Sequence, residues 1–255
     1  MLSRCCVDFY QLPLTQLLLG DSFHPGGLNL THQLALQTLV NRQSKVLDVA
    51  AGKGTTAHYL ANTFGATTYA VDRGIANLKI AKNNFGRQKI NILQGDATHL
   101  PFRSDSFDVV FCECALSTFG NRKRALTEMY RVLKPRGFIA ISDVYLNEPM
   151  PTDLHERLSQ WLCISGSLNA THSQQIIEYG GFRQVRFTDV SAQLLETIHA
   201  IEAKLTSPDP DLSQLIETEF HRQQTEWHEG IASRLAKFIY NGGAGYYTLT
   251  ARKPA

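Results

Sequence analysis

The chain has 255 residues and a mass of 28.5 kDa, a size typical of one large domain or one domain with an insertion. A hydrophobic fraction of 43% and a charged fraction of 19% exclude a disordered or fibrous chain. The net charge of +2 and the lack of a long Lys/Arg run argue against nucleic acid as a partner, and no long apolar stretch predicts a membrane span. The five cysteines have no disulfide or zinc-finger spacing, so we expect free thiols and a cytoplasmic protein.

Short apolar runs alternate with helical patterns between about residues 45 and 145. The predicted strands are 46–50, 67–72, 89–94, 107–112 and 138–144, and the predicted helices begin near residues 55, 75 and 122. The third helix has apolar residues at 126, 129, 130 and 133, and Lys134-Pro135-Arg136-Gly137 is predicted to end it. This alternation predicts right-handed βαβ units and a mostly parallel α/β sheet that is covered on both faces.

The pattern changes after residue 145. Helical segments at about 151–164 and 171–179 precede a strand at 182–190, and a last strand at 245–252 follows a glycine-rich turn. About fifty residues separate these two strands, far more than a hairpin needs, and they contain two amphipathic helical patterns. We therefore expect an N-terminal helical flap at 1–44, a cofactor-binding core at 45–190, a helical insertion at 191–240 and a last core strand at 241–255.

Acidic and small residues follow the first three predicted strands. Gly52 and Gly54 open the first turn, where a side chain would block a ligand, and Asp48 lies beside them, where it suits an ammonium group or an ordered water. Asp72 ends the second strand, where it can hold ribose hydroxyls, and Asp96 follows the third, where it can accept from an adenine amine. Each Asp alone could cap a turn or helix, but the ordered set predicts a cofactor site at the carboxyl edge of the sheet.

These motifs resemble those of the class I S-adenosylmethionine-dependent methyltransferases. The matching segments are Val46-Leu47-Asp48-x-Ala50-x-Gly52-x-Gly54, Asp72, Gly95-Asp96-Ala97-x-x-Leu100-Pro101-Phe102, Phe107-Asp108-Val109-Val110 and Arg131-Val132-Leu133-Lys134-Pro135-x-Gly137. The resemblance implies a Rossmann-like seven-stranded sheet whose last strand is antiparallel, with the helical insertion before that strand. It also implies S-adenosylmethionine as the cofactor, held by Asp48, Ala50, Gly52, Asp72, Asp96 and Ala97, with Glu113 beside it. Two positions depart from the pattern, since Ala50 and Arg136 stand where glycine is usual.

Two cysteines add a resemblance to the arsenite methyltransferase subgroup. Cys114 follows the fourth strand, and Cys163 lies in a Cys-x-x-Gly-small-Leu segment before a Gly-Phe turn. The resemblance implies that both thiolates hold trivalent arsenic, whose lone pair attacks the methyl group, and soft thiolates select such thiophilic ions. Thr55-Thr56 replaces a further cysteine of many members, so a third ligand would be glutathione, water, Cys5 or Cys6.

Other functions stay open from the sequence. A carbon or oxygen methyltransferase resembling the quinone-biosynthesis type would use Asp143, His24 or Glu113 as a base. A non-catalytic cofactor-binding module would bind the donor without turnover, and a nicotinamide-dependent oxidoreductase would depend on Gly52-x-Gly54 alone. We expect a small-molecule substrate, a monomer or homodimer, and no metal site, because none of the nine histidines pairs convincingly with another ligand.

Overall fold

The computed structural model describes residues 17–18, 20, 24–85, 90–158, 166–206, 214 and 230–255. Its strands are β1 (Lys45–Val49), β2 (Thr67–Asp72), β3 (Ile90–Gln94), β4 (Phe107–Glu113), β5 (Leu133–Leu146), β6 (Arg183–Asp189) and β7 (Ala244–Arg252). Its helices are α3 (Gly27–Gln37), α4 (Thr55–Phe64), α5 (Ile75–Phe85), α6 (Arg122–Val132), α7 (Thr152–Leu158), α8 (Ala170–Tyr179), α9 (Ser191–Leu205) and α11 (Ile231–Tyr240), with a short 3-10 helix at Leu116–Thr118.

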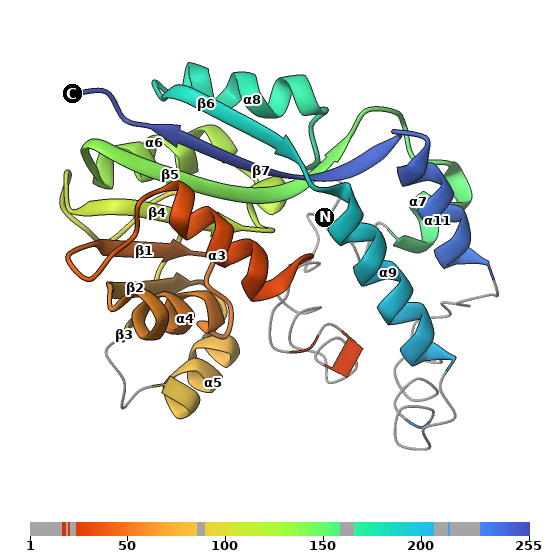
Figure 1. Cartoon of the computed structure of the whole chain (residues 1–255), viewed down its shortest axis with the longest axis horizontal. Helices are drawn as coiled ribbons and strands as arrows, with labels where there is room; N and C mark the ends of the chain where they lie inside the picture. The colour runs from red at the N-terminus through yellow and green to blue at the C-terminus, as the bar shows by residue number, and fades with distance from the viewer. Residues whose placement is uncertain are drawn as a thin grey trace.

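The strands form one seven-stranded sheet in the order β3-β2-β1-β4-β5-β7-β6 (Figure 1). Neighbours from β3 to β5 pair in parallel, and β7 runs antiparallel to both β5 and β6. The predicted fold class is therefore confirmed, including the antiparallel last strand and the helices α9 and α11 that precede it.

Helices cover both faces of the sheet because side chains alternate along buried strands. On β4, Val109 and Phe111 pack with residues of α3 and α4, such as Leu34 and Leu60. The next residues along the strand, including Val110, face the opposite layer with α6 and α8. The strands that the sequence predicts from near-continuous apolar runs thus bury both of their faces.

A separate apolar cluster joins α7, α9 and α11 beside the end of β5. Its buried members are Met150, Leu154, Ile198, Ile231, Ala232, Leu235, Ile239 and Ala244. The predicted helix at 151–164 is α7 up to Leu158, and its remaining part lies outside the described residues. Among the described residues, no helix has the length and apolar character that crossing a bilayer requires.

The helix α6 ends at Val132, just before the segment predicted to end it, and this segment also forms the start of β5. Leu133 pairs with Phe107, and the N–H of Arg136 donates to the carbonyl oxygen of Lys253 at 3.0 Å. Arg136 has a positive φ of 65°, so the backbone turns there without leaving the strand. The strand begins earlier than the predicted residue 138 because it pairs with C-terminal residues, which local sequence does not reveal.

Gly245 lies where β7 passes under the start of α9, and we expect Gly245→Ala to destabilise the fold. An added Cβ would lie 2.3 Å from Ser191 Oγ and 2.4 Å from the Tyr145 hydroxyl oxygen, which is far below contact distance. Overpacking of this kind costs about 2 kcal/mol, or roughly 4–8 °C in Tm. Thermal unfolding measures it, with Gly120→Ala as the control because nothing lies within 4 Å of that position. An equal Tm for both variants would contradict the expectation.

Candidate functional site

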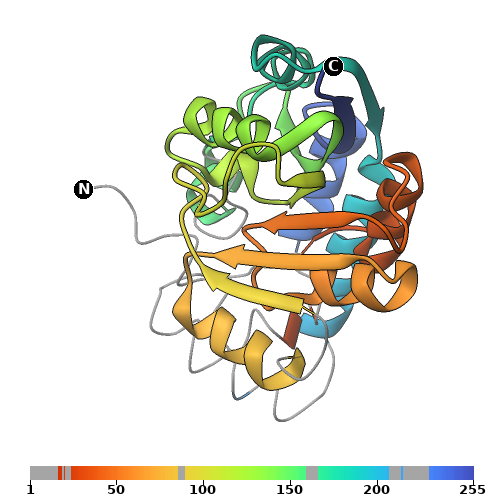
Figure 2. The ribbon, with the colours of Figure 1, turned by 90° about the vertical axis from the view of Figure 1, so that its left-hand side faces the viewer.

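Four carboxylates meet at the carboxyl edge of the sheet. Asp48 lies near the end of β1, Asp72 ends β2, Asp96 follows β3 and Glu113 ends β4. Figure 2 shows β1, β2 and β3 side by side with their arrowheads at this common edge. Parallel strands place their ligand-binding loops at such an edge, as the sequence predicted.

The loop after β1 takes a backbone shape that glycine favours. Ala50, Gly52 and Gly54 have positive φ values of 61°, 53° and 76°. Ala50 thus adopts the conformation of the glycine that it replaces, at a cost of about 1–2 kcal/mol for a residue with a Cβ. The loop still turns tightly, since the Gly54 N–H donates to the carbonyl oxygen of Ala51 at 2.8 Å.

Asp72 ties this loop to β2. Its Oδ2 accepts from the Gly52 N–H at 2.8 Å, and its Oδ1 accepts from the Gly74 N–H at 2.7 Å. Burial raises the pKa of this carboxyl group, and the hydrogen bonds from the two glycines oppose the rise. Each carboxylate oxygen keeps lone-pair capacity for a further donor, such as a ribose hydroxyl.

Asp96 and Ala97 form the turn after β3. Asp96 Oδ1 accepts from the N–H and the hydroxyl of Thr98, and its Oδ2 lies 3.5 Å from Nε of Arg73. The Asp96 side chain is 42% exposed, whereas Ala97 is buried. The exposed oxygen is thus open to a ligand beside a small, apolar residue.

Asp48 is a buried carboxyl group with an unused oxygen. It is 3% exposed, and its Oδ2 has no hydrogen-bond partner. Burial, and next the charge of Glu113, raise the pKa of Asp48 well above its usual value. An unpartnered buried oxygen is costly, so it suits a site that receives a donor or a cation from a ligand.

Glu113 collects donors from three segments of the chain. Thr56 Oγ1 donates to Oε2 at 2.7 Å, Thr31 Oγ1 donates to Oε1 at 3.1 Å, and His24 Nε2 lies 3.5 Å from Oε2. The side chains of His24 and Glu113 are only 7% and 4% exposed. Sequence reasoning missed Thr31 and the role of Thr56, because an isolated threonine on an amphipathic helix gives no functional signal.

Cys114 lies next to Glu113 with a positive φ of 50°. Its N–H donates to the carbonyl oxygen of Ser142 on β5 at 2.7 Å, and the residue is partly buried. The predicted partner Cys163, and also Cys5 and Cys6, lie outside the described residues. Within the described ranges, no group of three His, Cys, Asp or Glu side chains could hold a metal ion.

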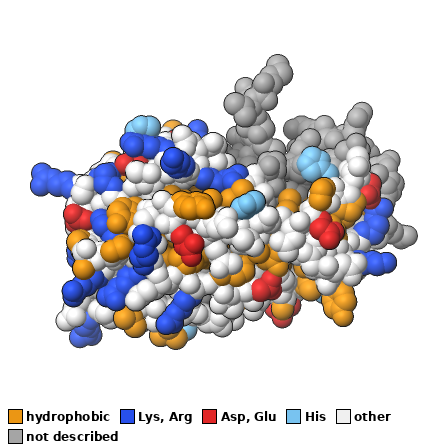
Figure 3. Space-filling model, turned by 90° about the horizontal axis from the view of Figure 1, so that it is seen from above, with side chains coloured by type: hydrophobic (Ala, Val, Ile, Leu, Met, Phe, Trp, Pro, Cys, Tyr) orange, Lys and Arg blue, Asp and Glu red, His pale blue; other side chains and the backbone are white. Residues whose placement is uncertain are grey.

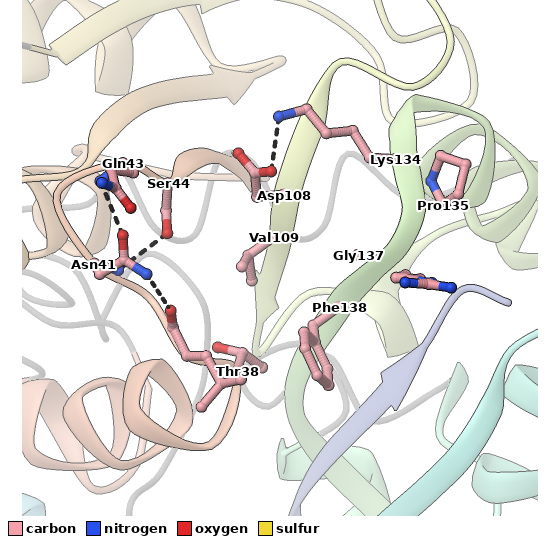
Figure 4. A pocket seen from close by; sticks show the side chains of 12 residues that line it. Thr38, Asn41, Gln43, Ser44, Asp108, Val109, Lys134, Pro135, Gly137 and Phe138 are labelled. Atoms are coloured by element: carbon pink, nitrogen blue, oxygen red, sulfur yellow. Dashed lines mark hydrogen bonds and ion pairs between the residues drawn. The ribbon is translucent and has the colours of Figure 1, made fainter. Parts of the chain in front are cut away.

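A polar hollow of about 370 Å³ lies at the opposite edge of the sheet (Figure 4). Its polar groups bind one another, since Lys134 Nζ pairs with Asp108 Oδ1 at 2.7 Å and the Asn41 N–H donates to Ser44 Oγ at 3.0 Å. Figure 3 shows Lys and Arg side chains more numerous toward this end of the molecule. The hollow does not include any of the four carboxylates. Lys134, Asp108, Asn41 and Ser44 each have a partner within it.

The carboxyl edge fits S-adenosylmethionine by its donor set. That cofactor carries a sulfonium and an ammonium charge, and the edge offers four carboxylates together with the unpartnered oxygen of Asp48. The loop at Ala50–Gly54 has the left-handed backbone that glycine favours. The residues present thus match a cationic nucleoside, and their charges would repel a pyrophosphate.

Residues 47–141 match the family of methyltransferase domains. Methyltransferase GfsG of Streptomyces halstedii is 28% identical over 242 residues, which cover 92% of this chain and 83% of that protein. A demethylmenaquinone methyltransferase of Renibacterium salmoninarum is 40% identical over 99 residues, which cover 39% of this chain and 40% of that protein.

The fold is similar to that of solved methyltransferases. Phosphoethanolamine N-methyltransferase 2 of Haemonchus contortus, in complex with S-adenosyl-L-methionine, superimposes with a TM-score of 0.76 at 18% identity. The match covers 97% of this chain and 60% of that chain. The [4+2]-cyclase SpnF has a TM-score of 0.75 at 21% identity, with 97% and 93% covered. Residues 47–141 are thus a methyltransferase domain, and these likenesses show that the chain has the fold of the class I S-adenosylmethionine-dependent methyltransferases.

Proposed function

We propose that the protein methylates a small organic acceptor whose reacting oxygen or carbon must lose a proton. The observation that carries this proposal is the buried pair of His24 and Glu113, with Nε2 3.5 Å from Oε2, at the carboxyl end of β4. A histidine beside a carboxylate is the usual arrangement of a general base. The demethylmenaquinone methyltransferase among the relatives makes a hydroquinone a reasonable first acceptor class.

Seven residues hold the cofactor in this proposal, namely Asp48, Ala50, Gly52, Asp72, Asp96, Ala97 and Glu113. Asp72 accepts from the ribose hydroxyls, Asp96 with Ala97 receives the adenine, and Ala50 and Gly52 give access to the backbone. Asp48 and Glu113 supply negative charge beside the cationic end. The bound cofactor supplies a methyl group on a positively charged sulfur, and the protein aligns the acceptor with it and excludes water.

His24 takes the proton of the acceptor. Its Nε2 faces Glu113, which orients the ring, and the carbonyl oxygen of Pro25 lies 3.3 Å from Nδ1. In the tautomer with its proton on Nδ1, the ring donates to that oxygen, and Nε2 keeps the lone pair that takes the proton of the acceptor. Glu113 then offsets the positive charge of the ring without itself leaving the hydrogen bonds from Thr31 and Thr56.

In this proposal, the described parts of the N-terminal flap (1–44) and of the helical insertion (191–240) border the acceptor. Lys204 of α9 donates to the carbonyl oxygens of Leu17 and Leu18 at 3.0 and 2.8 Å. The side chain of Gln193, also on α9, is in contact range of Gly26, because a Cβ on that glycine would lie 3.1 Å from Gln193 Cγ. These contacts support the two segments acting as one cover over the carboxyl edge.

The thiol-bound arsenic acceptor stays a prediction, and it provides the competing arm of the test. Cys114 adjoins Glu113, so a thiolate at this position would reach the same end of the cofactor site. An arsenic lone pair needs no base, so the two acceptor classes differ in their dependence on His24. The arsenic acceptor would require the Cys114 thiolate, whereas the organic acceptor would not.

We expect wild-type protein with labelled S-adenosylmethionine to methylate a 1,4-naphthoquinol, and His24→Ala to lower kcat by about 100-fold, the usual contribution of a general base. The Kd for S-adenosylmethionine should change by less than about threefold, since His24 does not contact the proposed donor residues other than Glu113. His32→Ala is the matched control, because His32 lies on α3 and its Nδ1 contacts the Tyr59 hydroxyl instead. Transfer to arsenite with glutathione, lost in Cys114→Ser and retained in His24→Ala, would replace this proposal.

A further inference from the structure

Asp143 is a buried carboxylate in β5 whose oxygens all face donors of the protein. It is 1% exposed, and its Oδ2 accepts from the Ser117 N–H at 2.7 Å. Its Oδ1 accepts from the Ser117 hydroxyl at 2.7 Å and from the Val144 N–H at 2.8 Å. With its oxygens already engaged by three donors, Asp143 is poorly placed to act as the base considered from the sequence.

These bonds hold the segment that follows Glu113. The 3-10 helix Leu116–Thr118 begins three residues after Glu113, and Ser117 is its central residue. One residue earlier in β5, the carbonyl oxygen of Ser142 accepts from the Cys114 N–H at 2.7 Å. Consecutive residues of β5 therefore anchor both Cys114 and Ser117, and thus the whole turn at the end of β4.

The same turn supports a second segment of the chain. A Cβ on Gly166 would lie 2.1 Å from the Ser117 carbonyl oxygen and 2.6 Å from Arg122 Nη2, so this glycine packs directly on both. A shift of Ser117 would therefore move Gly166 as well. The carboxylate of Asp143 therefore holds Ser117 directly and Gly166 through Ser117.

We propose that Asp143 is a positioning residue for methyl transfer, whose negative charge holds Ser117 and thereby keeps Glu113 and Cys114 in place at the acceptor edge. The expected effect on catalysis rests on the proposed function, whereas the anchoring of residues 114–118 by Asp143 does not. Loss of the charge removes an acceptor for the Ser117 N–H and relaxes the turn. A displacement of about 1 Å at such a position is enough to cost up to roughly 100-fold in rate.

The charge of Asp143 changes in a range that experiments can reach. Burial raises its pKa to about 6, while the hydrogen bonds from Ser117 and Val144 and the charge of Arg122 oppose the rise. The other titratable groups that face it are Cys112 on β4 and Tyr246 and Tyr247 on β7, whose pKa values are all raised by burial. Asp143 is therefore the group of this set that titrates near pH 6: it is ionised above that pH and becomes protonated below it.

Hydrogen exchange of peptides that contain residues 114–118 tests the inference without any acceptor. At pH 7.5 we expect Asp143→Asn to speed exchange there by at least about tenfold, because the amide NH₂ would face the Ser117 N–H and could not accept from it. Ser117→Ala should give a smaller increase, since it removes only the hydroxyl bond. Asp108→Asn, at the opposite edge of the sheet, is the control and should leave this region unchanged. Unaltered exchange in both Asp143→Asn and Ser117→Ala would overturn the inference.

Activity provides the second readout. In Asp143→Asn, kcat should fall by at least about tenfold, with the Kd for S-adenosylmethionine within about threefold of wild type. In a His24→Ala background, the residual kcat should still decline below about pH 6, and this inflection should be absent when Asp143 is also replaced by Asn. Full kcat in Asp143→Asn, or an inflection retained in the double variant, would contradict a positioning role. If Asp143→Asn does not bind the cofactor, its hydrogen exchange at pH 7.5 decides instead, since that measurement needs no cofactor. Failure of every acceptor would count against the proposed function and leave the exchange result intact.

Discussion

Replacing Asp72 with alanine is expected to weaken binding of S-adenosylmethionine by at least about 100-fold. Two hydrogen bonds from ribose hydroxyls to one carboxylate contribute about 1.5–3 kcal/mol each, and both would be lost. The substitution also releases the Gly52 N–H, which donates to Asp72 Oδ2 at 2.8 Å, so the loop at Ala50–Gly54 loses its tie to β2. The two losses act in the same direction on cofactor affinity.

Isothermal titration calorimetry with S-adenosylmethionine measures this effect directly. Asp108→Ala is the matched control, because Asp108 pairs with Lys134 and accepts from the Lys45 N–H at the opposite edge of the sheet. We expect the Kd of the control to stay within about threefold of wild type, as for a distant and independent site. Equal affinity in Asp72→Ala and wild type would mean that the cofactor does not use the end of β2.

Replacing Glu113 with alanine is expected to reduce kcat/KM by about 1,000-fold, within the range for loss of general base catalysis, and also to destabilise the fold. The change leaves the hydroxyls of Thr31 and Thr56 and the ring of His24 buried without their common acceptor. An unsatisfied buried polar group costs about 1–3 kcal/mol, so a total near 3 kcal/mol, or about 6–12 °C in Tm, is expected.

Glu113→Gln separates these two effects. The amide keeps the size of the side chain and one carbonyl acceptor, so most of the Tm should be retained. It lacks the negative charge that the proposed imidazolium needs, so activity should still fall by about 100-fold or more. Thermal unfolding and single-turnover transfer to the naphthoquinol measure the two quantities. Wild-type turnover by Glu113→Gln would remove the charge of Glu113 from the proposal.

The cofactor side of the site was accessible from sequence because each of its residues follows a strand that is recognisable by itself. Asp48, Asp72 and Asp96 end consecutive parallel strands, and parallel strands necessarily bring their carboxyl ends to one edge. Ala50 departs from the usual glycine, yet it adopts the left-handed backbone that glycine favours.

The acceptor side was not accessible in the same way. His24, Thr31 and Thr56 are 89, 82 and 57 residues from Glu113 in the chain, and no periodicity links them. Their meeting depends on how α3 and α4 pack on the face of the sheet that holds Phe111. Cys114 and Cys163 were predicted to lie close together because their sequence context resembles a known pair. Cys163 lies outside the described residues, so their proximity stays a prediction.

By itself, the sequence determined the order of strands and helices along the chain, because this order follows from local periodicity and from the geometry of βαβ units. The cofactor class came from motifs that resemble those of a known family, and the binding edge stays a prediction. The tertiary structure alone decided that Glu113 gathers His24, Thr31 and Thr56, that Asp143 anchors Ser117, and that β5 begins at Leu133. Those features arise from long-range packing, in which a buried polar group takes whatever partner the assembled layers bring within hydrogen-bond distance.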